Sequence, residues 1–172
     1  MTGKAKEELV SWIKTIVLAV AIALFINFVI IVNATVPTGS MENTIMAGDR
    51  VIASRLSYTF SDPERGDVVI FKYPDDEDVL YVKRIIGLPG DVVEVKNGGV
   101  YVNGEALEED YIKETTEGFY GPYEVPEDCY FMMGDNRNNS LDSRYWDNKF
   151  VEEDKILGKV LLKYYKKPAL VK

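Results

Sequence analysis

One hydroxyl stands out in the segment VPTGSMENTI, residues 36–45, which follows a long apolar run. Ser40 lies there between a glycine and a methionine. A serine hydroxyl becomes a nucleophile only when a nearby base takes its proton. The chain contains no histidine, so the commonest catalytic base and the commonest zinc ligand are both missing. A Ser-His-Asp hydrolase and a zinc hydrolase are therefore excluded, and we expect neither a metal nor a cofactor.

The remaining bases are a lysine, a carboxylate and the N-terminal amine, and the expected topology puts that amine across a membrane from Ser40. A lysine with its reference pKa near 10.4 is only about 0.04% neutral at pH 7. Lowering that pKa by about three units costs roughly 4 kcal/mol and requires burial in apolar surroundings. A lysine that serves as the base is therefore expected inside an apolar strand.

Lys83 meets that requirement in VLYVKRIIGLPGD, residues 79–91. Strand alternation predicts that Tyr81, Lys83 and Ile85 share one face. Lys72 in VIFKYP and Lys159 in ILGKVLL have comparable apolar neighbours and remain alternatives. Lys83 could also extend its amine from a strand edge into water without any catalytic role.

A third polar segment is GDNRNNSLDSRYWD, residues 134–147. Much of it could be a loop held by Asx turns and an Asp–Arg pair. A buried neutral lysine, however, needs a partner that fixes its position without recharging it, and a hydroxyl does this better than a carboxylate. By contrast, SWIK at residues 11–14 matches a Ser-x-x-Lys pattern by chance, because it lies at the edge of the apolar run without partner motifs.

The apolar run itself, Ile16–Val32, is interrupted only by Asn27 and would span roughly 26 Å as a helix, close to the apolar thickness of a bilayer. We expect a cytoplasmic tail over 1–14, a transmembrane helix over 15–33 and an extracytoplasmic domain over 34–172. Lys4, Lys6 and Lys14 all precede the run, which predicts a cytoplasmic N-terminus. A signal peptide cleaved after residues 32–34, or a buried core helix, are less favoured because the run is long and apolar on every side.

Beyond the run the pattern is that of strands, so we expect a mainly β, antiparallel ectodomain on one membrane helix. Runs rich in Val, Ile and Tyr are separated by Gly and Pro, in residues 49–56, 66–74, 79–87, 91–105 and 155–165. KNGGV at residues 96–100 predicts a hairpin turn. The acidic stretch 105–121 is expected to be an exposed excursion with one short helix. The net charge of −8 argues against a nucleic-acid partner, and the single cysteine, Cys129, permits no internal disulfide.

Taken in order, these motifs resemble the type I signal peptidases, membrane-anchored serine proteases with a Ser/Lys dyad. The resemblance covers nearly the whole chain. It comprises the N-terminal anchor and then GSM, GDRVI, RGDVVIF, YVKRIIGLPGD and GDNRNNSLDSRYW. The chain is similar in length to the shorter bacterial members. Its lack of histidine excludes the branch of the family in which histidine replaces the lysine.

The resemblance implies roles for individual residues. Ser40 would be the nucleophile and Lys83 the general base, with Ser140 orienting the lysine. The Ser40 N–H and the Thr38 hydroxyl would bind the oxyanion. Asp142 and Arg144 would form a structural pair near the site. The residues implied to line the substrate pockets are Val36, Pro37, Ile45, Val51, Tyr81 and Val82.

One position departs from the family pattern, because Asn43 stands where the family usually has proline. The absence of that rigid proline would loosen the segment after Ser40. This affects the expected substrate preference more than the expected activity.

The implied activity is removal of signal peptides from secreted preproteins after Ala-x-Ala-like sites, through an acyl-enzyme. The implied partners are those preproteins, the lipid bilayer and the secretion translocon, with the catalytic domain on the outer face of the plasma membrane. Two other classes fit the same residues less well: a membrane-tethered β module without catalysis, and a self-cleaving Ser/Lys protease of the repressor type. That second class is typically soluble and DNA-linked, which the apolar run and the acidic charge oppose.

Overall fold

The computed structural model describes residues 3–171, which form one N-terminal helix followed by a mainly antiparallel β body. The helical segment comprises α1 (Gly3–Phe25) and the π-helical η1 (Ile26–Ile30). The strands and short 3₁₀ turns follow in this order: β1 (Ile31–Thr35), β2 (Arg50–Ser54), η2 (Leu56–Tyr58), β3 (Val68–Tyr73), β4 (Asp76–Gly87), β5 (Val92–Lys96), β6 (Gly99–Val102), β7 (Glu105–Ala106), β8 (Tyr120–Glu124), β9 (Cys129–Met133), η3 (Arg137–Asn139), β10 (Val151–Glu152), η4 (Glu153–Lys155), β11 (Ile156–Lys163) and β12 (Ala169–Leu170).

The larger sheet has the strand order β1-β2-β11-β3-β4-β9-β10, with β12 added to β11. Every pairing in it is antiparallel, and β3 pairs with β4 so that Val69 lies opposite Lys83. The strands expected at 49–56, 66–74, 79–87 and 155–165 are present as β2, β3, β4 and β11. The mainly antiparallel fold predicted from the sequence is confirmed.

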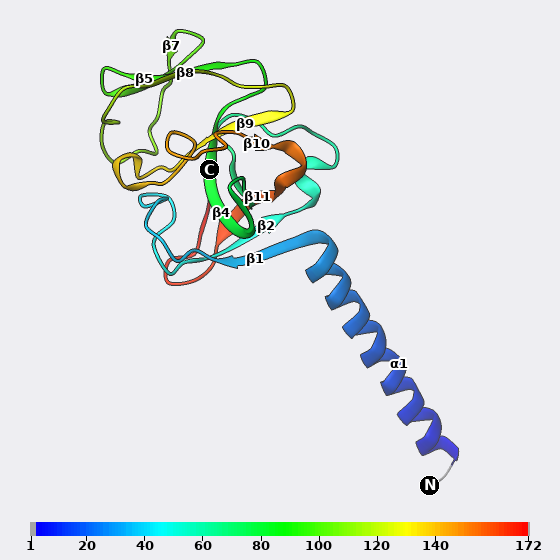
Figure 1. Cartoon of the computed structure of the whole chain (residues 1–172). Helices are drawn as coiled ribbons and strands as arrows, with labels where there is room; N and C mark the ends of the chain where they lie inside the picture. Colours follow the sequence, from blue (N-terminus) through cyan, green and yellow to red (C-terminus); the bar gives the residue numbers. More distant parts are fainter. Residues whose placement is uncertain (1–2, 172) are drawn as a thin grey trace.

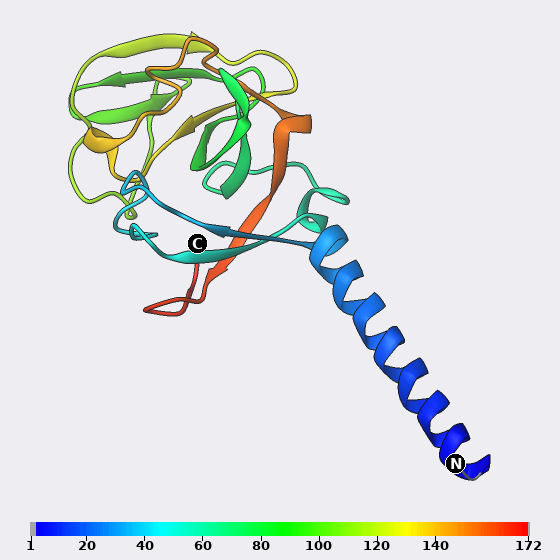
Figure 2. The ribbon, with the colours of Figure 1, turned by 60° about the horizontal axis from the view of Figure 1, so that its bottom comes forward.

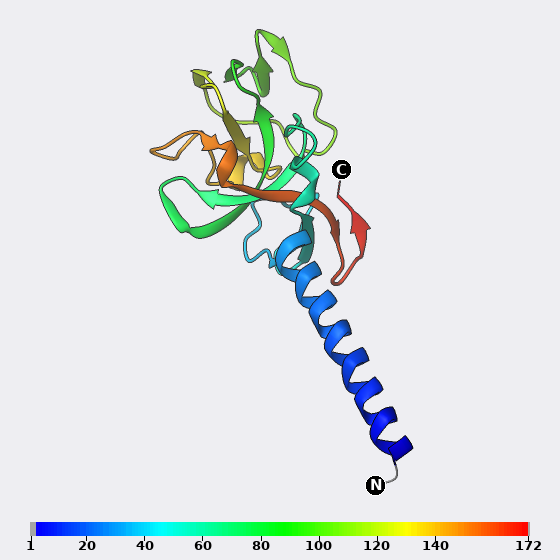
Figure 3. The same cartoon turned by 90° about the vertical axis from the view of Figure 1, so that its right-hand side faces the viewer.

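A smaller sheet, ordered β7-β6-β5-β8, lies at the end of the β body away from α1 (Figures 1 and 3). Its central hairpin turns at Asn97 and Gly98, whose φ angles of 53° and 82° are both positive. Two successive residues in that conformation make the tight turn that suits the twist of antiparallel strands. The hairpin predicted from KNGGV is therefore confirmed.

The helix α1 projects away from the β body and leads directly into edge strand β1 (Figures 1 and 2). Within the described residues, the segment Glu7–Ile30 is the one helix that is long and apolar enough to cross a membrane, and none of its apolar window is buried in the protein. At 1.5 Å per residue its 24 residues span about 36 Å. The helix begins earlier than the expected range of 15–33, and it ends before Ile31, where strand pairing starts.

The acidic stretch 105–121 does not form the short helix we expected. It contains strand β7 and an irregular segment that enters β8. Although most of its charged side chains are exposed, Glu109 and Tyr111 pack against the loop that begins at residue 134. The stretch is mostly exposed, as expected, except where Glu109 meets a buried arginine, Arg137, that local sequence could not assign to it.

Candidate active site

Ser40 lies in a turn within the connection 36–49 that joins β1 to β2. The Ile45 N–H donates to the Met41 carbonyl at 2.7 Å, closing one helix-like turn just after the serine. The Met41 and Ile45 side chains are fully buried in the core cluster that also contains Val36 and Val51. Two apolar side chains on one side of the turn thus fix the backbone, and Ser40 is left at its rim with 7% of its surface exposed.

Lys83 reaches Ser40 from the middle of β4. Its Nζ donates a hydrogen bond of 2.7 Å to Ser40 Oγ and another of 3.2 Å to the Val82 carbonyl. The Lys83 residue is only 4% exposed, and its amine lies 5.1 Å from the centre of the Tyr81 ring. The structure therefore brings together the two residues that the sequence singled out, at hydrogen-bond distance in a nearly dry site.

Burial lowers the pKa of Lys83 from 10.5 to about 8, while the negative charges of Asp142 and Asp135 partly oppose that shift. Among the described residues no carboxylate forms an ion pair with its amine. At a pKa of about 8, roughly one lysine in ten is neutral at pH 7. This fraction is far larger than that of a lysine in water, so the amine can accept a proton from Ser40.

The two alternative lysines lie in different environments. Lys72 forms an ion pair of 3.4 Å with Glu77 and its side chain is 41% exposed. Lys159 forms one of 2.5 Å with Asp67 and is 36% exposed. A carboxylate partner and access to water both favour the charged amine, so neither lysine resembles a general base.

Ser140 and Thr38 flank the Ser40–Lys83 pair. The Thr38 hydroxyl oxygen lies 3.4 Å from Ser40 Oγ. Ser140 is buried beside the Ser40 turn, but its Oγ has no hydrogen-bond partner within the described residues 3–171. The expected bond from Ser140 to the lysine is therefore not formed in this conformation, in which the amine donates to Ser40 and to Val82 instead.

Asp142 and Arg144 form the buried pair that the resemblance implied. Arg144 Nε and Nη2 donate to the two carboxylate oxygens of Asp142, each at 2.8 Å. Asp142 also accepts a bond of 3.0 Å from the Gly134 N–H. Charge-assisted bonds of this kind fix the loop that carries Ser140 to the end of β9.

A second buried ion pair, between Arg84 and Asp135, was not predicted from the sequence. Arg84, next to Lys83, donates to Asp135 from Nε at 2.8 Å and from Nη2 at 2.6 Å, and Thr44 Oγ1 donates to the same carboxylate at 2.5 Å. Asp135 thereby joins β4, the loop after β9 and the Ser40 turn. The apolar strand around Arg84 was the available signal, because an arginine buried there requires a carboxylate partner.

Two cavities flank the dyad. One, of about 100 Å³, lies between β1 and β4, and the other, of about 240 Å³, opens on the other side. The residues lining the smaller cavity are Ala34, Thr35, Val36, Pro37, Thr38, Ser40, Ile70, Leu80, Tyr81, Val82 and Lys83. The larger cavity is lined by Thr38, Gly39, Ser40, Tyr81, Lys83, Asn139 and Leu141.

Four of the six expected pocket residues line the smaller cavity, namely Val36, Pro37, Tyr81 and Val82. Ile45 and Val51 line neither cavity. Both are fully buried in the core cluster that Val36 also joins, so they lie behind the cavity wall. The sequence pattern could not separate residues on the wall from residues that pack behind it.

Within residues 3–171 no group of three or more acidic or cysteine side chains is placed to hold a metal ion. The groups that meet between the two cavities are the Ser40 and Thr38 hydroxyls and the Lys83 amine.

Comparison with known proteins identifies a family for the chain. The family model described as "Signal peptidase, peptidase S26" matches residues 9–165. The chain is 44% identical over 160 residues to a "Probable signal peptidase I-2" of Synechocystis sp., covering 90% of this chain and 72% of that protein. It is 38% identical over 170 residues to a "Signal peptidase I" of Leptolyngbya laminosa, covering 94% of this chain and 82% of that one.

Similarity extends to other bacteria and to a solved structure. A "Signal peptidase I S" of Bacillus subtilis is 41% identical over 150 residues, covering 81% of this chain and 80% of that protein. The crystal structure of a signal peptidase I from Enterococcus faecalis is 34% identical, with a TM-score of 0.47, and covers 58% of this chain and 97% of that one.

Proposed function

The chain belongs to the signal peptidase family, peptidase S26; it is a membrane-anchored peptidase that removes signal peptides from preproteins, and we propose that Ser40 and Lys83 perform the cut. One observation carries this proposal: a nearly buried amine donates a 2.7 Å hydrogen bond to the Ser40 hydroxyl, which lines both cavities. Because burial lowers the pKa of Lys83 to about 8, the amine can act as a base near neutral pH.

In the acylation step, Lys83 Nζ takes the Ser40 proton as Oγ forms a bond to the peptide carbonyl carbon. The carbonyl oxygen becomes an oxyanion, which the Ser40 N–H and the Thr38 hydroxyl bind. The Ser40 N–H makes no backbone hydrogen bond in the described part of the chain, so it is available as a donor. The C–N bond then breaks, and the Lys83 ammonium returns its proton to the leaving amine.

Deacylation uses the same groups with water as the nucleophile. The neutral Lys83 amine removes a proton from a water molecule, which attacks the ester carbonyl on Ser40. The oxyanion is again held by the same two donors; as the intermediate collapses, the C–Oγ bond breaks, the Lys83 ammonium returns the proton to Ser40 Oγ, and the acid product leaves. Ser140 Oγ, which is buried close to the Ser40 carbonyl and has no hydrogen-bond partner within residues 3–171, is the acceptor that we propose for the lysine ammonium once Ser40 no longer accepts from it.

The smaller cavity supports a preference for small residues before the cut. Its volume of about 100 Å³ and its wall of Val36, Ile70 and Val82 favour short apolar side chains. We propose that it selects Ala-x-Ala-like sequences. The larger cavity, beside Leu141, is open to a longer side chain.

The cell membrane, with the N-terminus in the cytoplasm and the β body outside, is the proposed location. Lys4, Lys6 and Lys14 precede the apolar segment, and positive residues favour the cytoplasmic side. In that orientation the β body faces preproteins as they emerge, so we also propose that the secretion translocon is a partner.

The test uses the whole chain in liposomes with a preprotein that carries a signal peptide, and mass measurement of the products maps the cut. We expect one cut after a small residue with the unmodified chain, and no product with Ser40→Ala or Lys83→Met. Lys72→Met is the matched control, because it removes an exposed lysine from the neighbouring strand. Normal cleavage by Lys83→Met would exclude the dyad, and absence of any cleavage by the unmodified chain would favour a non-catalytic β module.

A further inference from the structure

A segment between β7 and β8, residues 107–116, crosses from the smaller sheet to the candidate active site; we call it the strap. Its ends are tied to the β5–β6 hairpin, because the Leu107 N–H donates to the Val100 carbonyl at 2.8 Å and the Thr116 N–H to the Gly98 carbonyl at 3.0 Å. Its middle lies against residues that neighbour Lys83 and Ser140. None of the family motifs in the sequence includes this segment.

Glu109 holds the strap to the loop that carries Ser140. Arg137 donates to its two carboxylate oxygens, from Nη1 at 2.6 Å and from Nη2 at 2.5 Å. The side chain of Glu109 is 4% exposed and that of Arg137 is fully buried. A two-pronged, charge-assisted contact with little access to water is a strong and directional one.

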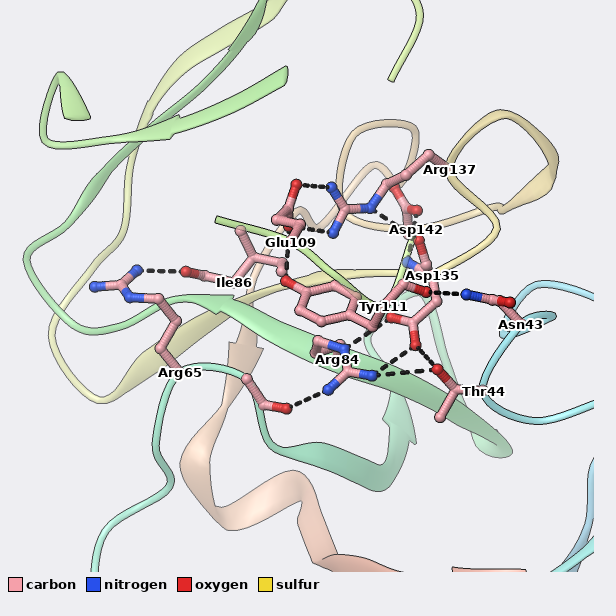
Figure 4. Close-up of polar contacts among 12 residues, drawn as sticks. Asn43, Thr44, Arg65, Arg84, Ile86, Glu109, Tyr111, Asp135, Arg137 and Asp142 are labelled. Atoms are coloured by element: carbon pink, nitrogen blue, oxygen red, sulfur yellow. Dashed lines mark hydrogen bonds and ion pairs between the residues drawn. The ribbon is translucent and has the colours of Figure 1, made fainter. Parts of the chain in front are cut away.

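Tyr111 connects that contact to the strand that carries Lys83. Its ring lies between Arg84 and Arg137 (Figure 4), with the Arg84 guanidinium carbon 3.8 Å from the ring centre. Its hydroxyl donates to Glu109 at 2.7 Å. One aromatic ring therefore contacts the residue that follows Lys83 and the residue that anchors the loop of Ser140.

Asn43 completes the connection on the side of Ser40. Its Nδ2 donates to the Tyr111 carbonyl at 2.7 Å, a contact that Figure 4 also shows. Asn43 has a φ of 92°, a conformation that proline cannot adopt and that asparagine tolerates better than most residues. The position at which this chain departs from the family pattern is thus the one that binds the strap.

We propose that the strap is a positioning element that holds the Ser40 turn in register with Lys83, with Asn43, Glu109 and Tyr111 as the positioning residues. The inference rests on the proposed function of the dyad. The strap contacts the three segments that build the site: the Ser40 turn through Asn43, β4 through Arg84 and the Ser140 loop through Arg137. None of the strap residues lines either cavity beside the dyad, so the strap acts on the geometry of the site, and through it on water access, rather than on substrate.

Replacing Tyr111 tests the ring at the centre of the strap. In the whole chain in liposomes, Tyr111→Ala should lower kcat by about tenfold or more while KM stays within roughly twofold, since misplacement of the reacting atoms affects the chemical step. Water entering beside Lys83 should also move the acid limb of the kcat profile to higher pH, because hydration raises the pKa of a buried lysine. Tyr111→Phe keeps the ring between the two arginines and should restore most of kcat.

Two further variants test the contacts on either side. Asn43→Gly removes the bond to the strap at a backbone conformation that glycine adopts freely, and should show the same fall in kcat and the same shift in pH dependence. Glu109→Gln should do likewise, whereas Glu108→Gln, an exposed neighbour, should behave as the unmodified chain. If Tyr111→Ala does not fold, the kcat and pH profile of Asn43→Gly test the role of the strap.

The inference is overturned if Asn43→Gly and the folded Tyr111 variants keep the wild-type kcat and pH profile. It is also overturned if the variants lose only folded protein, with unchanged kcat per folded molecule. Failure of the unmodified chain to cleave any preprotein is a different result, because it removes the proposed function and not the strap alone.

Discussion

At the residue scale, the site depends on the protonation of one amine. Lys83 has a pKa of about 8 because burial disfavours its charged form. The hydrogen bond to Ser40 is 2.7 Å long, so the neutral amine needs no rearrangement to receive the hydroxyl proton. The absence of a direct ion pair between Lys83 and a carboxylate in the described residues matters as much as the contact with Ser40, since Lys72 and Lys159 each form such a pair.

The first prediction concerns the pH dependence of catalysis. Because only neutral Lys83 accepts the proton, kcat/KM should rise about tenfold per pH unit below the pKa of the free enzyme and level off above a midpoint near 8. Steady-state cleavage of one signal-peptide substrate between pH 6 and 9.5 measures this profile, with circular dichroism as the control for folding. A flat profile over that range, or a midpoint near 10, would contradict the role of a buried lysine.

The second prediction is that the same amine destabilises the fold. The pKa of Lys83 is 10.5 in the unfolded chain and about 8 in the folded chain. Below pH 8 the buried charge lowers the free energy of unfolding, and this loss disappears as the pH rises from about 8 to about 10.5. The shift corresponds to an upper limit of about 3 kcal/mol. We therefore expect Lys83→Met to raise the free energy of unfolding by about 1–3 kcal/mol at pH 6 and by little at pH 10.5.

Denaturant unfolding of the whole chain in detergent, at both pH values, measures this difference. Lys72→Met is the matched control, because the substitution replaces the same atoms at a lysine that is exposed. Destabilisation by Lys83→Met at pH 6 would show that the lysine contributes to packing more than its charge costs.

At the element scale, the dyad is assembled by a turn, a strand and a loop that are distant in sequence. The strands themselves could be predicted from their alternating apolar pattern. That pattern alone could not select Lys83, because Lys72 and Lys159 have comparable apolar neighbours and yet are partly exposed. The Ser40–Lys83 contact could be inferred only through the resemblance, since no local pattern reports which serine faces which lysine.

The buried ion pairs also could not be predicted, because local sequence does not report contacts between distant segments. The pairs Arg84–Asp135 and Arg137–Glu109 join segments far apart in the chain, and their partners are chosen by folding. In the acidic stretch 105–121, exposed and buried carboxylates look alike in sequence. Glu108 and Glu109 are neighbours, yet only Glu109 meets a buried arginine.

The third prediction concerns the end of β9, where the sheet meets the Ser40 turn. A Cβ on Gly134 would overlap the Ser40 carbonyl oxygen and Ser140 Oγ, so the two segments approach closely only because this residue has no side chain. Gly134→Ala should push the Ser40 turn away and lower kcat roughly 100-fold, the size expected for a misplaced catalytic group. Peptide cleavage by the folded variant measures this.

The control for that substitution is Gly99→Ala. Gly99 lies in β6, where an added Cβ makes only an ordinary contact with Tyr101, so this variant should keep normal kcat. Normal activity in Gly134→Ala as well would mean that the Ser40 turn adapts, and that the site is less rigid than its contacts indicate.

At the scale of the whole molecule, the membrane helix and the β body are joined without a flexible linker. The helical segment ends at Ile30 and β1 begins at Ile31, with Val32 already buried in the core. Ser40 lies in the turn that follows β1. The anchor therefore holds the site close to the membrane surface, and signal peptides lie in that same membrane.

The last prediction follows from that geometry. Removing residues 1–30 deletes the anchor but keeps β1, so the β body should fold and cleave a short soluble peptide at nearly the normal rate. Cleavage of a preprotein inserted in liposomes should fall roughly 100-fold, because the enzyme and substrate no longer share one surface and the effective concentration is lost. Removing residues 1–35 should instead destabilise the β body, since β1 and the buried Val32 go with it. Comparing the two truncations on both substrates separates tethering from folding, and equal rates on the membrane substrate with and without α1 would show that the helix anchors the protein without contributing to catalysis.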